Sequence, residues 1–363
     1  MWKNNQFMEL LIRIKTMRTR SHVTSWGCLV LVCLFLFICW INMVIKPHTG
    51  QIIKASIDVD IGCWNKDFRK IIGKKFFRCR KGVTPWTRDD VIKELEVFRD
   101  VYDKRPEQNV FGTEIMQQFT LWMIIRQLNP LYIIESGVNF GLGTWMLRQA
   151  APLARLIMID PRETDRLRYK DLMYNSVYLH GISHFKDFSQ VNWTNYINNR
   201  EKTLVFFDDH QSHYKRLKQA KDLGFKHLVF DDNGHPTKGD VYSINHACDA
   251  GRCITDRIAP QSKHTIVKDN FGTAEEAITA DDALEMAQYI HDSIEIYYQF
   301  PPLWHIFDTT RVQYLLPHKI SYKINPIPLM NLKQAKLYQK NFTQKLNIDD
   351  LTSYTNMCYV KLK

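Results

Sequence analysis

Two pairs of aspartates follow apolar runs in the second half of the chain, in an arrangement that could bind a metal ion. Asp208 and Asp209 follow the run "LVFF", and Asp231 and Asp232 follow the run "HLVF". If both runs are strands of a parallel sheet, the four carboxylates meet at one edge, where they repel each other unless a cation lies between them. Mg²⁺ prefers such oxygen ligands. The spacing predicts a metal site, and the alternative for each pair is a solvated loop that caps a helix.

Histidines next to the first acidic pair could supply a general base. His210 follows Asp209 directly and His213 comes three residues later. An imidazole titrates near neutral pH, as proton removal from a hydroxyl requires. We therefore expect His210, His213 and Asp209 to belong to the catalytic group. The identity of the base stays open among these two histidines and a residue that the pattern does not reveal.

A glycine-rich stretch, "IIESGVNFGLGTW", precedes these pairs. Gly137, Gly141 and Gly143 come after an apolar run that ends at Glu135. Without a Cβ, such a loop lets backbone amides approach a ligand closely. The spacing is G-x-x-x-G-x-G, which differs from the usual dinucleotide fingerprint. A tight turn without a ligand is the alternative explanation.

Two further acids have the position of nucleoside ligands. Asp160 ends the next apolar run, where doubly wound sheets hold a ribose diol, because a carboxylate accepts hydrogen bonds from two hydroxyls. Asp187 precedes Phe188 and could accept a hydrogen bond from an adenine amino group while the ring packs on the base. Taken alone, each acid is also typical of a helix cap or of the surface.

The elements that must position these residues alternate in type. Short apolar runs predict strands at 132–134, 156–159, 203–207 and 227–230, and helical runs follow at 143–150 and 212–223. This alternation predicts a doubly wound, Rossmann-like α/β domain with a mostly parallel sheet covered on both faces. Capping boxes begin helices at Thr87 and Thr279, and we expect the second helix to include "SIEIYY".

The N-terminal part predicts a membrane anchor. Residues 23–45 contain no charged side chain, and about 20 apolar residues span a bilayer as a helix. Residues 1–22 carry five basic residues and one acidic residue, so the N-terminus should be cytoplasmic. We predict an uncleaved signal anchor of a single-pass type II protein of the Golgi or another secretory-pathway membrane, with a luminal body.

The expected organisation has five parts: a tail (1–22), the anchor (23–45), a stem with a helical region (46–105), the catalytic domain (106–320) and a C-terminal extension (321–363). Sequons at Asn192 and Asn341 are those of a glycoprotein. The net charge is +11 without a dense basic run beyond the anchor, so we expect no nucleic acid partner, and acidic glycans or a membrane surface are compatible.

The stretch from Glu135 to Thr144, followed by Asp160 and the two acidic pairs, resembles class I S-adenosylmethionine-dependent methyltransferases. It is similar more narrowly to the Mg²⁺-dependent sugar O-methyltransferases and the cephalosporin-hydroxylase-like group. The resemblance covers residues 110–235. It departs from the pattern after Asp208, where the third residue is Gln211 rather than histidine.

The resemblance implies a luminal O-methyltransferase that uses S-adenosylmethionine and Mg²⁺ to modify a sugar or glycan hydroxyl. It implies that the cofactor is bound by Glu135, Gly137, Gly141, Gly143 and Asp160, and that the metal is bound by Asp208, Asp231 and Asp232. Three other readings stay open: a Golgi glycosyltransferase that uses a nucleotide sugar and Mn²⁺, a non-catalytic protein with the same fold, and a hydroxylase.

Overall fold

The computed structural model describes residues 82–106, 112–233, 242–248, 265–268, 275–278, 280–305, 327–352 and 357–363. All of them belong to one compact unit, Val59–Lys363. Within these ranges, every helix is too short or too polar to cross a bilayer. The expected tail and anchor, residues 1–45, lie outside them.

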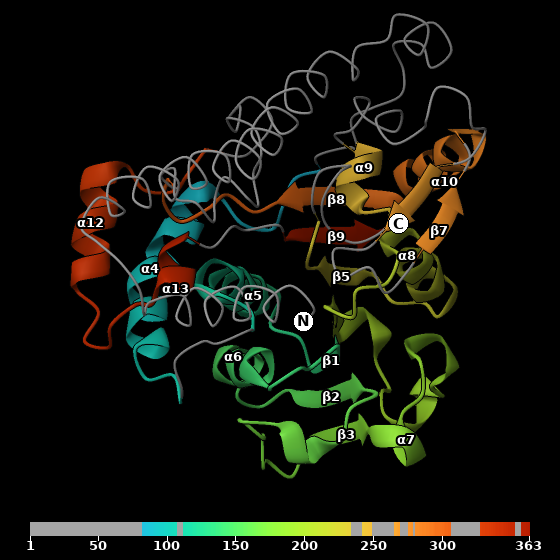
Figure 1. Cartoon of the computed structure of the whole chain (residues 1–363), viewed down its shortest axis with the longest axis horizontal. Helices are drawn as coiled ribbons and strands as arrows, with labels where there is room; N and C mark the ends of the chain where they lie inside the picture. Colours follow the sequence, from blue (N-terminus) through green and yellow to red (C-terminus); the bar gives the residue numbers. More distant parts are fainter. Residues whose placement is uncertain are drawn as a thin grey trace, which may run out of the picture. The chain divides into compact units, whose positions relative to one another are not determined.

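Seven strands form one mixed sheet in the order β3-β2-β1-β4-β5-β9-β8 (Figure 1). The strands are β1 (Tyr132–Ser136), β2 (Arg155–Asp160), β3 (Ser176–His180), β4 (Thr203–Phe207), β5 (His227–Phe230), β8 (Ile294–Gln299) and β9 (Cys358–Leu362). The first five are parallel, and β9 is antiparallel to both of its neighbours. This topology confirms the expected α/β class with a mostly parallel sheet.

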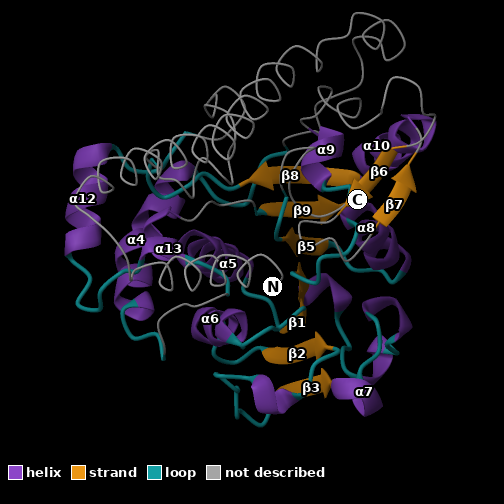
Figure 2. Ribbon diagram, viewed as in Figure 1, coloured by secondary structure: helices purple, strands orange, loops and turns teal. Residues whose placement is uncertain are grey.

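Helices cover both faces of the sheet (Figure 2). One face packs against α4 (Arg88–Tyr102), α5 (Ile115–Leu128), α6 (Leu142–Ala150), α12 (Leu332–Lys340) and α13 (Ile348–Thr352). The other packs against α8 (His213–Asp222), α9 (Ile244–Cys248) and α10 (Ala280–Ser293). Neighbouring strand residues alternate between the two cores, as Ile133 and Ile134 do, because side chains of a strand point to opposite faces.

Smaller elements complete the described chain: α7 (Gly181–His184), a separate two-stranded sheet of β6 (Thr265–Lys268) and β7 (Glu275–Ile278), and 3₁₀ turns at Thr164–Arg166, Phe188–Gln190, Trp193–Asn195 and Arg200–Lys202. The capping box at Thr87 is present, with Thr87 and Asp90 bonded reciprocally.

One expectation about the C-terminal third was wrong. The helix that was expected to include "SIEIYY" ends at Ser293, and β8 begins at the next residue, because alternate residues such as Ile294 and Ile296 are buried beside an exposed Glu295. The expected extension, 321–363, contributes β9, which lies inside the sheet between β5 and β8.

The strand order places β1 beside β4, and the chain proceeds from them toward opposite edges of the sheet. In open α/β sheets, ligands bind outside the carboxyl ends of the strands at this switch point. The stretches selected from the sequence follow the carboxyl ends of β1, β2, β4 and β5.

Candidate functional site

The turn between β1 and α6 is so tightly closed that its first two glycines have no room for a side chain. Gly137 has a φ of +89°, and a Cβ there would lie 2.1 Å from the carbonyl oxygen of Asp208. Gly141 has a φ of +91°, and its Cβ would lie 2.1 Å from the carbonyl oxygen of Tyr169. The tight-turn explanation therefore accounts for both glycines. Because neither has a side chain, the turn lies against the carboxyl end of β4 at Gly137 and against the segment between β2 and β3 at Gly141.

Asp160 joins the turn after β1 to the turn after β2. Its Oδ2 accepts hydrogen bonds from the backbone amides of Val138 (2.9 Å) and Asn139 (3.1 Å), and its Oδ1 accepts one from the amide of Arg162 (2.8 Å). Because a carboxylate has about four acceptor sites in all, Oδ1 retains capacity for a ligand hydroxyl. The expected binding of a ribose stays a prediction.

His180 was not recognised in the sequence, although it lies beside Asp160. The two residues are partners in the parallel register of β2 and β3. His180 is 4% exposed, and neither ring nitrogen has a hydrogen-bond partner among the described residues. Burial lowers its pKa, and a neutral ring offers one donor and one acceptor. The signal in the sequence was an apolar strand that ends in His-Gly, at the same edge as Asp160.

Glu135 lies inside the protein below the glycine turn. Its carboxyl group accepts a hydrogen bond from the hydroxyl of Thr144 at 2.5 Å, and a Cβ on Gly143 would lie 2.5 Å from its Oε1. Burial, with a smaller contribution from Asp160, raises the pKa of Glu135 to about 8. At neutral pH this carboxyl group is therefore mostly protonated, and it holds the first turn of α6 against β1.

Arg216 on α8 engages two of the predicted acids. It pairs with Asp209 at 2.8 Å and with both carboxylate oxygens of Asp187, at 3.0 and 2.7 Å. Ser136 also donates a hydrogen bond to Asp209 at 2.6 Å. Although burial opposes it, hydrogen bonds from Arg216 and Ser189 lower the pKa of Asp187 to about 2. Asp187 thus ties the segment after β3 to α8, and the adenine contact stays a prediction.

Two of the expected metal ligands, Asp231 and Asp232, are engaged by other side chains, Asp232 by His210. The Gln117 amide donates to both carboxylate oxygens of the buried Asp231, at 2.9 and 2.8 Å. Asn233 accepts bonds from Asn245 through its side chain (2.7 Å) and its carbonyl (3.2 Å). In the described part of the chain, no three His, Cys, Asp or Glu side chains are grouped so that they could hold a metal ion. These residues do not form a prepared metal site.

The two candidate histidines have different surroundings. His210 Nδ1 lies 3.2 Å from Asp232 Oδ2, and the two side chains are 37% and 24% exposed. His213 is 1% exposed, stacks on Phe230 with ring centroids 4.6 Å apart, and accepts a hydrogen bond at Nδ1 from the amide of Ile244 (3.3 Å). His210 therefore faces the edge of the sheet as part of a His–Asp pair, whereas His213 is a core residue.

Comparison with known proteins bears on the fold alone. No protein-family model and no curated protein matches the chain. Among solved structures, an O-methyltransferase from Bacillus cereus in complex with SAH is 13% identical, with a TM-score of 0.30, and the match covers 59% of this chain and 85% of that one. An SAH-bound methyltransferase from Podospora anserina is 14% identical, with a TM-score of 0.27 and coverages of 47% and 71%. The protein cmcI with Mg and SAM is 22% identical, with a TM-score of 0.24 and coverages of 35% and 58%.

Proposed function

We propose that this chain is an S-adenosylmethionine-dependent O-methyltransferase. The observation that carries the proposal is the pair of turns after β1 and β2, joined through Asp160 at the switch point of a sheet with this strand order. A carboxylate and an unsatisfied imidazole, Asp160 and His180, stand side by side there. They suit the hydroxyls of a nucleoside, which can both donate and accept hydrogen bonds.

Asp160, His180 and the backbone of the glycine turn would hold the cofactor. S-adenosylmethionine, when bound, supplies an electrophilic methyl group. Because Asp160 is fixed by three backbone amides, its carboxylate is oriented before any ligand arrives. Such preorganisation lowers the free energy that binding would otherwise spend on ordering the site.

His210 is the proposed general base. Asp232 accepts a hydrogen bond from Nδ1 of His210, so the other ring nitrogen, Nε2, is the one that can take the proton of an acceptor hydroxyl. The carboxylate of Asp232 then stabilises the imidazolium that forms, as the acid of a catalytic triad does. No metal ion is needed for this step.

The acceptor and the location are further proposals that rest on the chain outside the described ranges. We infer a sugar or glycan hydroxyl as acceptor, with the body on the luminal side of a secretory-pathway membrane. Cys248 is disulfide-bonded, which suits an oxidising compartment. Asn192 and Asn341 are both exposed, so each could carry a glycan without disturbing the core.

Calorimetric titration of S-adenosylmethionine tests the proposal. The Asp160→Asn variant should lose at least about tenfold in affinity, because in either orientation of the asparagine amide its NH₂ faces a backbone N–H donor, that of Arg162 or those of Val138 and Asn139. Asp165→Asn, an exposed substitution in the following 3₁₀ turn, is the matched control. Absence of binding to the unmodified chain, together with Mn²⁺-dependent binding of UDP- or GDP-sugars, would favour the glycosyltransferase alternative.

A further inference from the structure

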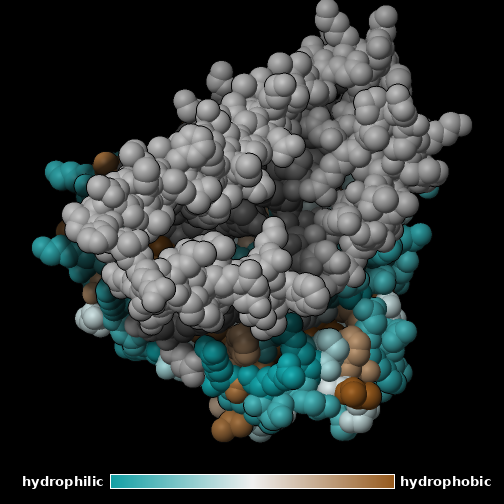
Figure 3. All heavy atoms as spheres, viewed as in Figure 1, coloured by the Kyte–Doolittle hydropathy of each residue, from teal (hydrophilic) through white to brown (hydrophobic). Residues whose placement is uncertain are grey.

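The edge of the sheet opposite the candidate site carries exposed apolar side chains. Three of the parallel strands begin beside them: Leu131 precedes β1, Leu153 precedes β2, and Leu172 and Tyr174 precede β3. Their exposures are 55%, 91%, 84% and 95%, respectively. Isolated exposed leucines are ordinary in proteins, but here they recur on neighbouring loops, and such gatherings mark interaction sites. Figure 3 shows brown atoms at the lower margin of this face, near the part of the sheet that contains β2 and β3 in Figure 1.

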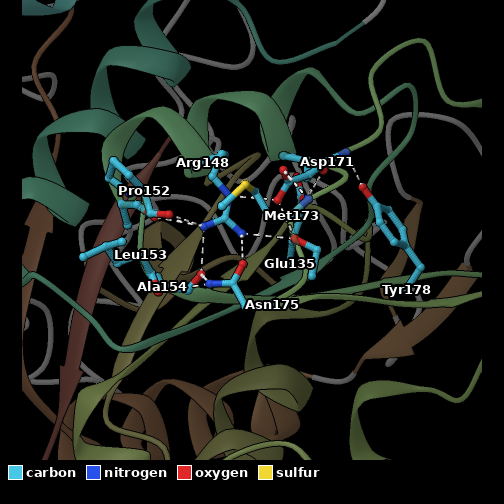
Figure 4. Close-up of polar contacts among 12 residues, drawn as sticks. Glu135, Arg148, Pro152, Leu153, Ala154, Asp171, Met173, Asn175 and Tyr178 are labelled. Carbon is cyan, nitrogen blue, oxygen red and sulfur yellow. Dashed lines mark hydrogen bonds and ion pairs between the residues drawn. The ribbon is translucent and has the colours of Figure 1, made fainter.

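A buried arginine holds the loops that carry these side chains. Arg148, 6% exposed, pairs with Asp171 at 2.8 Å and donates to the carbonyl oxygens of Pro152 (2.8 Å) and Ala154 (2.9 Å), as Figure 4 shows. It also donates to the side chain of Asn175 at 3.0 Å. One guanidinium thus fixes both the loop before β2 and the loop before β3. The apolar side chains are presented on ordered backbone, as expected for a surface that has a partner.

Direct hydrogen bonds place the loops side by side. The side-chain amide of Asn175 donates to the carbonyl oxygen of Leu153 at 3.1 Å, and the amide of Arg155 donates to that of Leu131 at 2.9 Å. The amide of Leu131 in turn donates to the carbonyl oxygen of Lys202 at 2.9 Å. The apolar loops therefore continue into the loop before β4, which is basic.

Basic residues occupy the rest of the same edge. We define the amino edge as the apolar residues Leu131, Leu153, Leu172, Met173 and Tyr174 together with the basic residues Arg155, Arg200, Lys202, Lys226 and Lys361. Lys226 pairs with Glu201 and Lys361 pairs with Glu295, each at 2.9 Å. Even with these two acids included, the edge keeps a positive charge.

We propose that the amino edge docks on the surface of an anionic lipid bilayer. Leucine side chains at loop tips can enter the acyl boundary, a tyrosine ring suits the headgroup level, and Lys and Arg bind lipid phosphates. A second copy of the chain is a poorer occupant, because two edges of the same sign repel and the whole chain has a net charge of +11. Docking in this way would turn the carboxyl ends of β1 and β4 away from the lipid. The proposal requires neither methyl transfer nor the predicted anchor. Because the anionic leaflet of cell membranes is the cytoplasmic one, it is an alternative to the luminal location proposed above and does not rest on it.

Hydrogen exchange of the full chain in lipid nanodiscs tests the proposal. The discs contain phosphatidylcholine alone or phosphatidylcholine with phosphatidylserine, and the chain in detergent is the reference. Amides of 151–155 and 171–175 should exchange about tenfold more slowly in the anionic discs when most molecules are docked. Amides of 137–141, at the opposite edge, should exchange equally in all three preparations.

A charge-introducing variant makes the test specific. The double substitution Leu172→Asp with Tyr174→Asp should abolish the lipid-dependent protection, whereas Ile348→Asp, at a residue that is 62% exposed on α13, should not. Equal exchange rates in the two kinds of disc would overturn the proposal. Protection that persists in the double variant would also overturn it. Protection in detergent that grows with protein concentration would overturn it as well, because it would identify a second copy of the chain as the occupant.

Discussion

The imidazole of His210 and the carboxylate of Asp232 meet across two loops, with Nδ1 3.2 Å from Oδ2. Both residues have a left-handed backbone, with φ values of +53° and +46°. Such values are uncommon for residues other than glycine, and backbone strain of this kind gathers at functional sites. The two strands that precede these loops, β4 and β5, are neighbours in the sheet, and this adjacency brings the pair together.

Loss of either member of this pair should slow methyl transfer. We expect His210→Gln to lower kcat by about 10²–10⁴-fold and to leave S-adenosylmethionine affinity unchanged, because a positioned base contributes about that factor. Asp232→Asn should lower kcat by a smaller factor, and the double variant should be no slower than His210→Gln, because the two residues act as a unit. His291→Gln, at a side chain that is 41% exposed on α10, is the control. Full activity of His210→Gln would rule out His210 as the base.

Two glycines of left-handed conformation should differ in their tolerance of alanine. Gly224→Ala should cost about 1 kcal/mol, because a Cβ there meets only the Arg200 side chain, 3.7 Å away. Gly137→Ala should cost more and should also weaken cofactor binding, since its Cβ would lie 2.1 Å from a backbone carbonyl. Urea unfolding measures the first effect and calorimetry the second. Equal stabilities of the two variants would show that the turn is less constrained than its geometry indicates.

The buried Glu135 should make stability depend on pH. Its pKa is raised from 4.5 to about 8 in the folded protein. Between these values the folded chain retains a proton that the unfolded chain releases. The free energy of unfolding should therefore fall as pH rises through this window, by at most about 1.4 kcal/mol per pH unit. Glu135→Gln keeps the shape without the titration, so its stability should change less across the window. Parallel pH profiles for the two proteins would contradict this account.

Arg148 should be far more important for stability than an exposed arginine. Arg148→Met should destabilise the fold by about 3–5 kcal/mol, because it leaves the buried Asp171 carboxylate without its partner. Arg126→Met, at a side chain that is 45% exposed and paired with Glu94, should cost less than about 1 kcal/mol. Denaturant unfolding of both variants measures the difference. Similar denaturation midpoints for the two variants would show that the hydrogen bonds and the ion pair of Arg148 contribute little to the stability of the fold.

Activity should survive removal of divalent cations. The reason is that the proposed base, His210 paired with Asp232, removes the hydroxyl proton without a metal ion, while Gln117 binds both carboxylate oxygens of Asp231. Transfer assayed in EDTA should proceed at the rate measured without it. Loss of activity in EDTA that Mg²⁺ restores would show that these contacts rearrange, and would support the metal site that the resemblance implied.

The local pattern of the sequence was sufficient to predict most of the sheet. The strands expected near 132, 156, 203 and 227 are β1, β2, β4 and β5, because a fully buried strand needs a short continuous apolar run whatever its neighbours are. The end of the long C-terminal helix was missed, because "IEIYYQ" suits either structure until its partner is known. That partner is β9, about 60 residues later in the chain, and its antiparallel insertion between β5 and β8 depends on long-range pairing.

For the site, the sequence alone determined which turns contain acids, glycines and histidines, because these residue types and the ends of the strands are local features. The tertiary structure decided which side chains form hydrogen bonds and ion pairs with those residues. Arg216 engages Asp187 and Asp209, Gln117 engages Asp231, and His210 pairs with Asp232. The partners belong to different elements, so sheet order and register set their distances. A hydrogen bond forms only when donor and acceptor lie within about 3 Å of each other. The spacing of residues along the chain does not specify distances between side chains with this precision.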